Sequence, residues 1–219
     1  MIHLQEVCKY YRKDGQIVKA LDAINLDVKK GEFLIVRGPS GSGKTTLLLT
    51  IGGMLRPTKG NVKIDGKDIY TLSERAKSRL RAEKIGFVFQ MFHLLPFLTT
   101  LENVVLPAGA VGKSPDKKRA GDILNRLHLN ERMNHRPGEL SAGERQRTAL
   151  ARALYNEPDI ILADEPTGNL DEENARQVLG DLSEFHKNGG TVIVVSHGPM
   201  AEHYADRVLY LRDGLLAKD

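Results

Sequence analysis

The chain has 219 residues, of which 41% are hydrophobic and 27% charged, and this balance is typical of a globular protein with a substantial core. The formal net charge of +4 is mildly basic, and its clusters at residues 75–84 and 113–119 are most simply solvated helix faces, with nucleic acid or an anionic membrane surface as the alternative. A single cysteine, Cys8, excludes an internal disulfide and a cysteine-based metal cluster. No stretch reaches the ~20 apolar residues of a membrane span, and the first residues lack a signal-peptide pattern. We therefore expect a cytoplasmic protein.

The chain opens with apolar and polar residues that alternate over residues 2–7 and again over 24–28. This pattern predicts two half-exposed strands of an antiparallel sheet, with Tyr10 and Tyr11 between them. An aromatic face can stack on adenine because every base has a π surface. Tyr11 is the candidate for this contact and Tyr10 the alternative, while ordinary packing is the simpler explanation of a tyrosine here.

A phosphate-binding loop is predicted where the apolar strand 33–36 meets the pattern G-x-x-x-x-G-K-[ST] and a helix that starts near Lys44. Glycines allow successive backbone N–H groups to point at an anion, and the helix start adds its positive dipole end. Lys44 would neutralise the β and γ phosphates, and the Thr45 hydroxyl would bind Mg²⁺. The residues expected to hold the nucleotide here are Gly38, Pro39, Ser40, Gly41, Ser42, Gly43, Lys44, Thr45 and Thr46.

After a charged surface helix over 73–84, two further strands end in single polar side chains. The apolar run 85–89 ends at Gln90, and the run 191–196 ends at His197. Ligands of open α/β sheets bind at the carboxyl ends of the strands. Gln90 could therefore reach Mg²⁺ or the attacking water, and His197 could contact the γ-phosphate.

Between these strands, the apolar run 160–163 ends in two acids, Asp164 and Glu165. A continuous apolar run indicates a buried parallel strand, which brings both carboxylates to the ligand edge of the sheet. Asp164 would hold Mg²⁺ directly or through water, and Glu165 would polarise the water that attacks the γ-phosphate. Together with the phosphate-binding loop, the two acids predict hydrolysis.

The segment from 91 to 157 differs in character and is predicted to be an inserted helical lobe. Its first part, residues 91–98, is rich in Phe, Met and Leu beside a proline, which suggests an exposed docking surface as well as core. Helices are expected near 101–106 and from the Ser114-Pro115 cap to about 127. Two terminal strands, 207–211 and 215–217, complete the predicted elements.

A third helix of this lobe begins at Ser141 and runs to Leu154. Ser141 and Glu144 form a capping box, and the simplest explanation is a well-started helix. The functional interpretation is that this helix start, with Ser141 and Gly143, binds a second phosphate. Both interpretations use the same local geometry.

These motifs, in this order, resemble the ATP-binding cassette (ABC) ATPases over nearly the whole chain. The resemblance implies an α/β fold: a P-loop NTPase core (1–90 and 158–219) with an antiparallel β subdomain, and a helical subdomain (91–157) that carries the signature motif. Matched one by one, the implied site residues are Tyr11 on adenine, Lys44 and Thr45 of Walker A, Gln90 of the Q-loop, Ser141 and Gly143 of the signature, Asp164 of Walker B, Glu165 as catalytic base, Asp171 of the D-loop and His197 of the switch.

The same resemblance implies ATP and Mg²⁺ as cofactors and a head-to-tail dimer with a second copy, in which each signature helix closes on the partner's γ-phosphate. A narrower likeness, in residues 86–96 and 163–171, is to lipoprotein-releasing, macrolide-efflux and cell-division cassettes. It implies an integral membrane permease that docks near Gln90 to Leu98 and holds the ATPase on the inner face of the cell membrane. The sequence departs from the family pattern at Ala142, at Glu144, where glutamine is frequent, and at Gly198-Pro199.

The expected function is therefore an ATPase that drives lipoprotein release or the efflux of amphipathic substrates. The alternative is a mechanotransmitting or cell-division ATPase whose membrane partner transports nothing. A cassette that acts on nucleic acid is less consistent with the sequence, which has no concentrated basic stripe, second cassette or coiled-coil insertion.

Overall fold

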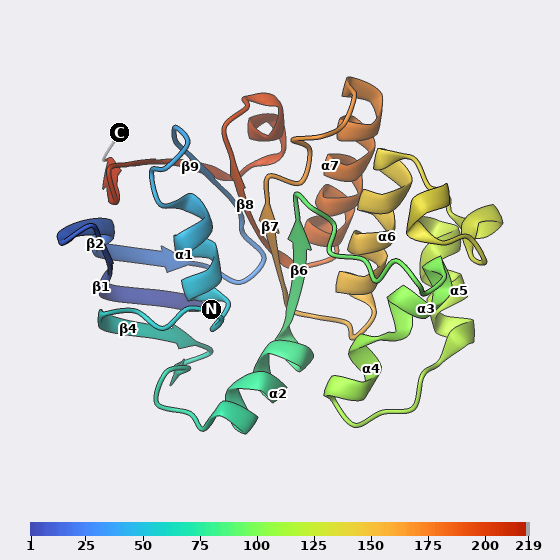
Figure 1. Ribbon diagram of the computed structural model, residues 1–219, viewed down its shortest axis with the longest axis horizontal. Coiled ribbons are helices and arrows are strands. Elements are labelled where there is room, and N and C mark those ends of the chain that lie inside the picture. The colour runs from blue at the N-terminus through green and yellow to red at the C-terminus, as the bar shows by residue number, and fades with distance from the viewer. Residues whose placement is uncertain (218–219) are drawn as a thin grey trace.

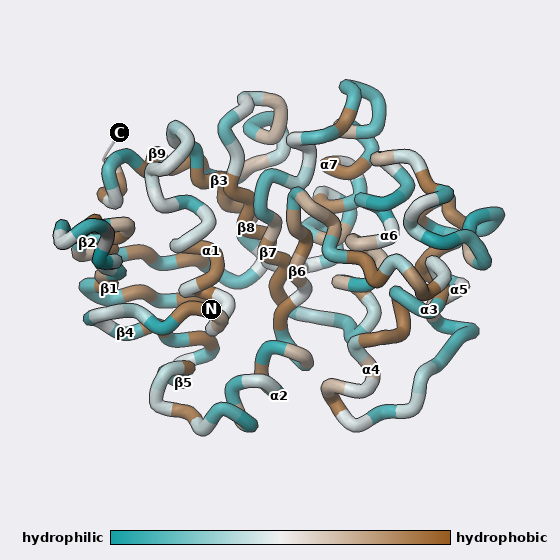
Figure 2. The backbone as a smooth tube through the Cα atoms, viewed as in Figure 1, coloured by the Kyte–Doolittle hydropathy of each residue, from teal (hydrophilic) through white to brown (hydrophobic). Residues whose placement is uncertain are grey.

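The long apolar runs of the sequence form the six-stranded sheet at the centre of the computed structural model, which describes residues 1–217 (Figure 1). β10 runs antiparallel to β9, and the other five strands are parallel. Helices cover the faces of such a sheet, so its inner strands are apolar on both sides, and Figure 2 shows β3, β8, β7 and β6 in brown. In spatial order the strands are β10 (Leu215–Ala217), β9 (Arg207–Arg212), β3 (Phe33–Arg37), β8 (Thr191–Ser196), β7 (Ile160–Asp164) and β6 (Ile85–Phe89).

A second, antiparallel sheet confirms the predicted β subdomain, but its first strand is longer than expected. The register of β1 against β2 shifts between Leu4 and Val7 and twice more before Tyr10. Each irregularity breaks the two-residue alternation that identifies a strand in a sequence. Tyr10 and Tyr11 thus lie within β1, not between strands. In spatial order this sheet contains β2 (Gln16–Val28), β1 (Ile2–Lys13), β4 (Lys59–Ile64) and β5 (Lys67–Asp68).

Most helices lie where the sequence predicts them, but α4 (Pro107–Ala110) was not predicted and the start of α5 (Lys117–Arg126) is corrected. The Asp116 side chain caps α5 by accepting the backbone N–H of Arg119 at 3.0 Å, so the helix does not begin at Ser114-Pro115. The Tyr155 hydroxyl fixes this cap by accepting the Asp116 backbone N–H at 2.7 Å. The helices are α1 (Lys44–Ile51), α2 (Glu74–Lys84), α3 (Thr100–Val105), α4 (Pro107–Ala110), α5 (Lys117–Arg126), α6 (Ala142–Leu154) and α7 (Glu172–Lys187), with 3-10 turns at Asn130–Arg132, Pro137–Glu139 and Met200–Tyr204.

The sequence pattern alone suggests that the charged face of α2 is fully solvated, but in the structure part of it is buried. Lys77 is buried, and its ammonium group lies 5.3 Å from the centre of the Tyr70 ring and 2.7 Å from Glu74. The long apolar stem of a lysine can cover core residues while its charged end finds a partner. Part of the basic cluster at 75–84 is thus used in packing.

Two apolar cores lie on opposite faces of the six-stranded sheet. The first fills the space between the two sheets and includes Leu47, Leu48 and Ile51 of α1. The second joins the sheet to the helical lobe through residues such as Leu150 of α6 and Leu179 of α7. No helix within residues 1–217 has the length and apolar character needed to cross a lipid bilayer.

Candidate functional site

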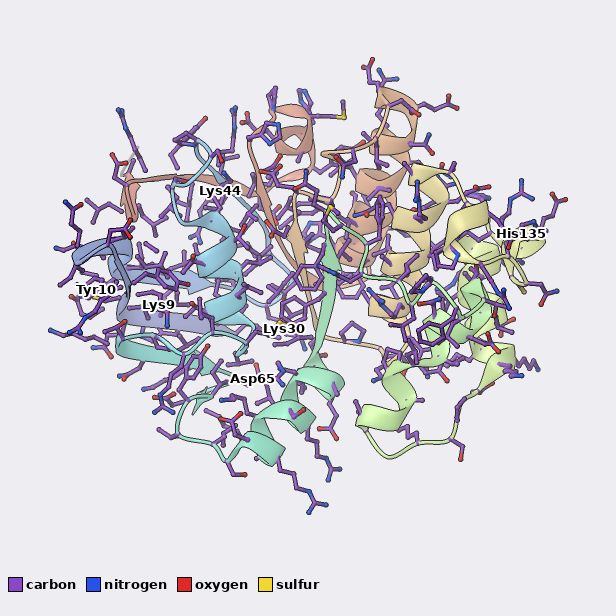
Figure 3. The ribbon with its side chains drawn as sticks, viewed as in Figure 1. Lys9, Tyr10, Lys30, Lys44, Asp65 and His135 are labelled. Atoms are coloured by element: carbon purple, nitrogen blue, oxygen red, sulfur yellow. The ribbon has the colours of Figure 1, made fainter. Side chains whose placement is uncertain are left out.

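The predicted phosphate-binding loop lies between the end of β3 and the start of α1, where Figure 3 labels Lys44. Gly43 has a φ of 104°, and a Cβ there would lie 2.1 Å from the carbonyl oxygen of Ala20, so only glycine fits. The Lys44 ammonium group donates to the carbonyl oxygens of Gly38 (2.7 Å) and Pro39 (3.0 Å). The loop is thus folded around the buried end of a lysine.

Asp164, at the carboxyl end of β7, faces the start of α1. The Thr45 hydroxyl donates to Asp164 Oδ1 at 3.1 Å. Burial raises the pKa of the Asp164 carboxyl above its usual value, opposed by the hydrogen bond from Thr45 and reinforced by the neighbouring charge of Glu165. A cation at this point would favour the ionised carboxylate and reverse the shift.

Glu165 connects three parts of the site. Its backbone has a φ of 45°, and its N–H donates to the carbonyl oxygen of Val195 at 2.9 Å, which ties it to β8. Its Oε2 lies 2.9 Å from His197 Nδ1 and accepts the His197 backbone N–H at 3.3 Å, while Oε1 lies 3.9 Å from the Lys44 ammonium group. In the tautomer protonated at Nδ1, the His197 N–H would donate a hydrogen bond to this carboxylate.

Gln90, which follows β6, is held by residues just beyond the two acids. A Cβ on Gly168 would lie 2.8 Å from Gln90 Nε2, and the Asn169 side-chain amide donates to the Gln90 carbonyl oxygen at 3.3 Å. Gly168 thus leaves room for the end of the Gln90 side chain, a contact that the sequence pattern does not reveal.

These elements enclose a cavity of about 590 Å³ that is open to solvent. Ala20 was not predicted from the sequence, because an alanine in a strand carries no distinguishing signal. The residues that line the cavity are Ala20, Ser40, Gly41, Gly43, Lys44, Thr45, Thr46, Gln90, Glu165 and His197.

Tyr11 does not line this cavity, although its strand leads there. Tyr11 pairs with Val18, which lies two residues along β2 from Ala20 of the cavity. Its ring is 40% exposed and has the Lys9 ammonium group 5.3 Å from its centre. Tyr10, the alternative, donates its hydroxyl to Asp22 at 2.7 Å, so the geometry favours Tyr11 as the free aromatic face.

Ser141, Gly143 and Asp171 also lie outside the cavity. Ser141 is exposed at the N-terminus of α6, and His135, in the segment that leads to it, lies on the opposite side of the molecule from Lys44 (Figure 3). A single chain therefore does not bring Ser141 to its own phosphate-binding loop.

Asn174 brings Gly143 and Asp171 together. Both Asp171 carboxylate oxygens accept hydrogen bonds from the Asn174 amide, at 3.0 and 2.8 Å, and Asn174 bonds hold the pKa of Asp171 below its usual value. Asn174 Oδ1 accepts from Arg147 at 3.0 Å, and a Cβ on Gly143 would lie 2.0 Å from this oxygen. The first turns of α6 and α7 therefore meet through one amide.

The residues of the cavity are suited to binding a nucleoside triphosphate together with a divalent cation. The Ser42 hydroxyl is buried and has no hydrogen-bond partner among the described residues, so it is free to meet a ligand. Within residues 1–217, no group of three or more His, Cys, Asp or Glu side chains could hold a metal. Mg²⁺ in phosphate sites takes one or two protein ligands and completes its shell with phosphate and water, and Thr45 and Asp164 could supply such ligands.

Residues 21–168 match the protein family described as "ABC transporter". The matched range includes the phosphate-binding loop, Gln90, Asp164 and Glu165. The chain belongs to this ABC transporter family. It is an ATP-binding protein of the ABC type and therefore an ATPase, as the sequence predicted.

Relatives of this ABC ATPase match it along its whole length. The ABC transporter ATP-binding protein YvrO of Bacillus subtilis is 46% identical, and MJ0796 of Methanocaldococcus jannaschii is 44% identical; each alignment covers 100% of this chain and 96% of the relative. The macrolide export ATP-binding/permease protein MacB of Brucella melitensis is 42% identical over 100% of this chain, which spans only 34% of MacB.

The fold is that of MJ0796. A solved dimeric structure of that cassette in a post-hydrolysis state, bound to ADP and Pi, superposes with a TM-score of 0.94 at 41% identity, covering 100% of this chain and 97% of that one. The likeness confirms the predicted α/β ABC ATPase fold with its antiparallel β subdomain.

Proposed function

We propose that this ABC ATPase hydrolyses ATP between two copies of itself and thereby drives an integral membrane permease. The observation that carries the proposal is the division of the site: the cavity contains Lys44, Glu165 and His197, whereas Ser141 lies exposed on a separate lobe. A phosphate in the cavity of one copy lies at the start of α1 of that copy, and it can meet the N-terminus of α6 only from another copy. That MJ0796 has been solved as a dimer supports this arrangement.

The contacts within the cavity support a role for each side chain. Lys44 would turn from the loop carbonyls to the β and γ phosphates, and Tyr11 would stack on the adenine. Glu165 would accept a proton from the attacking water, while His197 orients the carboxylate and contacts the γ-phosphate. Gln90 would help to place the water and the metal, and Asp171 would position the first turn of α7 beside the partner.

Mg²⁺ fits the space beside Asp164 and Thr45, with Gln90 as a further oxygen ligand. When bound, the cation would neutralise charge on the phosphates. Asp164 would then be held ionised, because an adjacent positive charge opposes the effect of burial on its pKa.

The docking surface proposed for the permease is the segment from Gln90 to Leu98 between β6 and α3, brown over much of its length in Figure 2. Met91 is 69% exposed and Phe97 67%, values uncommon for large apolar side chains in a monomer. The segment follows Gln90 directly, so a partner bound here would be coupled to the cavity. Bound to this permease, the ATPase would lie on the inner face of the cell membrane. Residues 91–157 would move as the helical subdomain against the core.

The likeness to MacB, a macrolide export ATP-binding/permease protein, supports a permease partner and the export of an amphipathic substrate. A pull-down from native membranes, followed by identification of the co-purified protein, tests this part. We expect an integral membrane permease with a short cytoplasmic helix. Recovery of ribosomes or nucleic acid alone would contradict it.

Glu165→Gln tests the composite site. The amide cannot accept the proton of the attacking water, so turnover should fall by at least about 100-fold. With Mg²⁺ and ATP, light scattering should show the 24.3 kDa monomer doubling in mass. Glu83→Gln, the same change on the exposed face of α2, should retain normal turnover. Near-normal hydrolysis by Glu165→Gln would mean that another group is the base.

A further inference from the structure

The signature helix α6 carries a charge that opposes the role proposed for it. Glu144 is the third residue of α6, in the turn whose free N–H groups would meet a phosphate. A carboxylate in that turn repels an incoming anion. In the dimer, which this inference takes from the proposed function, the anion is the terminal phosphate held by the second copy. The repulsion must therefore be removed by some other group.

Protonation of Glu144 does not remove this repulsion. Partial burial acts to raise the pKa of Glu144, but hydrogen bonds from Ser141 and Arg132 outweigh burial and hold the pKa below its usual value. The carboxylate is thus ionised at neutral pH, and its charge has to be balanced by a neighbouring group.

Two contacts bind the Glu144 carboxylate back onto its own helix start. Oε2 accepts the Ser141 backbone N–H at 2.7 Å, while the Ser141 hydroxyl accepts the Glu144 N–H at 3.2 Å. Oε1 accepts from Arg132 Nε at 2.8 Å. The capping box uses one carboxylate oxygen, and Arg132 supplies a full positive charge to the other.

The position of Arg132 in the chain favours its contact with Glu144. It ends the short 3-10 turn Asn130–Arg132 in the segment that leads to α6. The Glu144 side chain is only 19% exposed and that of Arg132 40%, so solvent screens this pair less than an ordinary surface pair.

We infer that Arg132 is a positioning residue of the signature motif, which holds the ionised Glu144 carboxylate back on its own cap and away from an incoming anion, so that one helix start can hold an ionised cap and receive a phosphate. A purely structural role would be to anchor the segment before α6. Glu144→Gln separates the two roles, because an amide oxygen still accepts from Arg132 but carries no charge.

The test measures the ATP concentration at which half of the protein dimerises, by light scattering with Mg²⁺, in the Glu165→Gln background. Arg132→Gln should raise this concentration roughly tenfold when Glu144 is present, an effect of the size expected for a charge at a helix terminus. In combination with Glu144→Gln, the same change should have less than a twofold effect. Equal losses in both backgrounds would overturn the inference.

Arg79→Gln is the matched control. Arg79 Nε also donates to a glutamate Oε1 at 2.8 Å, that of Glu83, but on α2. It should leave dimerisation unchanged. Arg132→Lys keeps the charge and should keep the half-maximal concentration within about threefold of the parent; a loss as large as that of Arg132→Gln would also overturn the inference.

The outcomes separate this inference from the proposed function. If the Glu165→Gln parent stays monomeric at saturating Mg²⁺ and ATP, the composite site is wrong and the inference fails with it. If the parent dimerises but Arg132→Gln dimerises equally well, the inference alone is wrong. Thermal denaturation of each variant shows whether the fold is retained.

Discussion

At the scale of single residues, one carboxyl group with a strongly raised pKa lies away from the nucleotide cavity, at Asp181 of α7. Asp181 lines a smaller cavity of about 240 Å³ between the ends of α5, α6 and α7. Its Oδ2 is buried without a hydrogen-bond partner among the described residues. Burial raises the pKa of Asp181 to about 6, although the charges of Arg147 and His128 act to lower it.

Asp181→Asn should therefore change stability in a pH-dependent way. The pKa of this carboxyl is higher in the folded chain than the ~3.9 of an unfolded one, so ionisation destabilises the fold increasingly from about pH 4 to pH 6 and fully above it. At pH 7.5 the variant should gain about 1–2 kcal/mol of unfolding free energy, allowing for partial exposure, and near pH 4 almost nothing.

Urea denaturation at both pH values measures this difference. Asp122→Asn, at an exposed position on α5, is the control and should be nearly neutral at both. An equal gain at pH 4 and pH 7.5 for Asp181→Asn would show that charge burial is not the cause.

At the scale of elements, the contact between α6 and α7 depends on the missing side chain of Gly143. Asn174 occupies the space that a Cβ would need, and Arg147 and Asp171 fix its amide from two sides. The signature helix and the helix that follows the two acids are thereby joined at their first turns.

Gly143→Ala should lower the free energy of unfolding by about 1–3 kcal/mol, because the new methyl group forces the two helices apart. Gly180→Ala, in the middle of α7 with no atom within 4 Å of the added Cβ, should instead raise it by up to about 1 kcal/mol. Chemical denaturation of the two variants compares them directly. A stabilising Gly143→Ala would mean that Asn174 moves aside without cost.

The same elements show what a sequence can predict. The sequence predicts Lys44 from its glycine-rich pattern, and it predicts Asp164 and His197 because each follows a long apolar run that indicates a strand. The extension of β1 was missed because bulges interrupt its alternation. Arg132 and Gly168 were missed because their roles exist only in contacts with distant positions, Glu144 and Gln90.

At the scale of the whole molecule, nucleotide binding should be visible as stability. The cavity joins β3, α1, β7 and β8, so a ligand there holds the central sheet and both cores together. A ligand at 100 times its dissociation constant adds about 2.7 kcal/mol to the folded state. For a chain of this size that is a rise in Tm of roughly 5–10 °C.

Lys44→Ala should abolish most of this ATP-dependent rise, because the loop loses the cation that meets the phosphates. The comparison is the change in Tm between samples with and without Mg²⁺ and ATP, and EDTA should reduce the wild-type shift. Lys67→Ala, at an exposed position on β5, serves as the control. A full shift in Lys44→Ala would contradict the role given to Lys44.

The order of strands in the central sheet also has a consequence for biosynthesis. β3, which carries the phosphate-binding loop, pairs only with β8 and β9 among the described strands, and β8 begins at Thr191. A nascent chain emerging from a ribosome therefore has its glycine-rich loop long before that loop has neighbours. Such distant pairing slows folding and exposes apolar strands meanwhile. ATP should consequently be unable to rescue truncated chains that end before β8, because the site can assemble only after β8 has been synthesised.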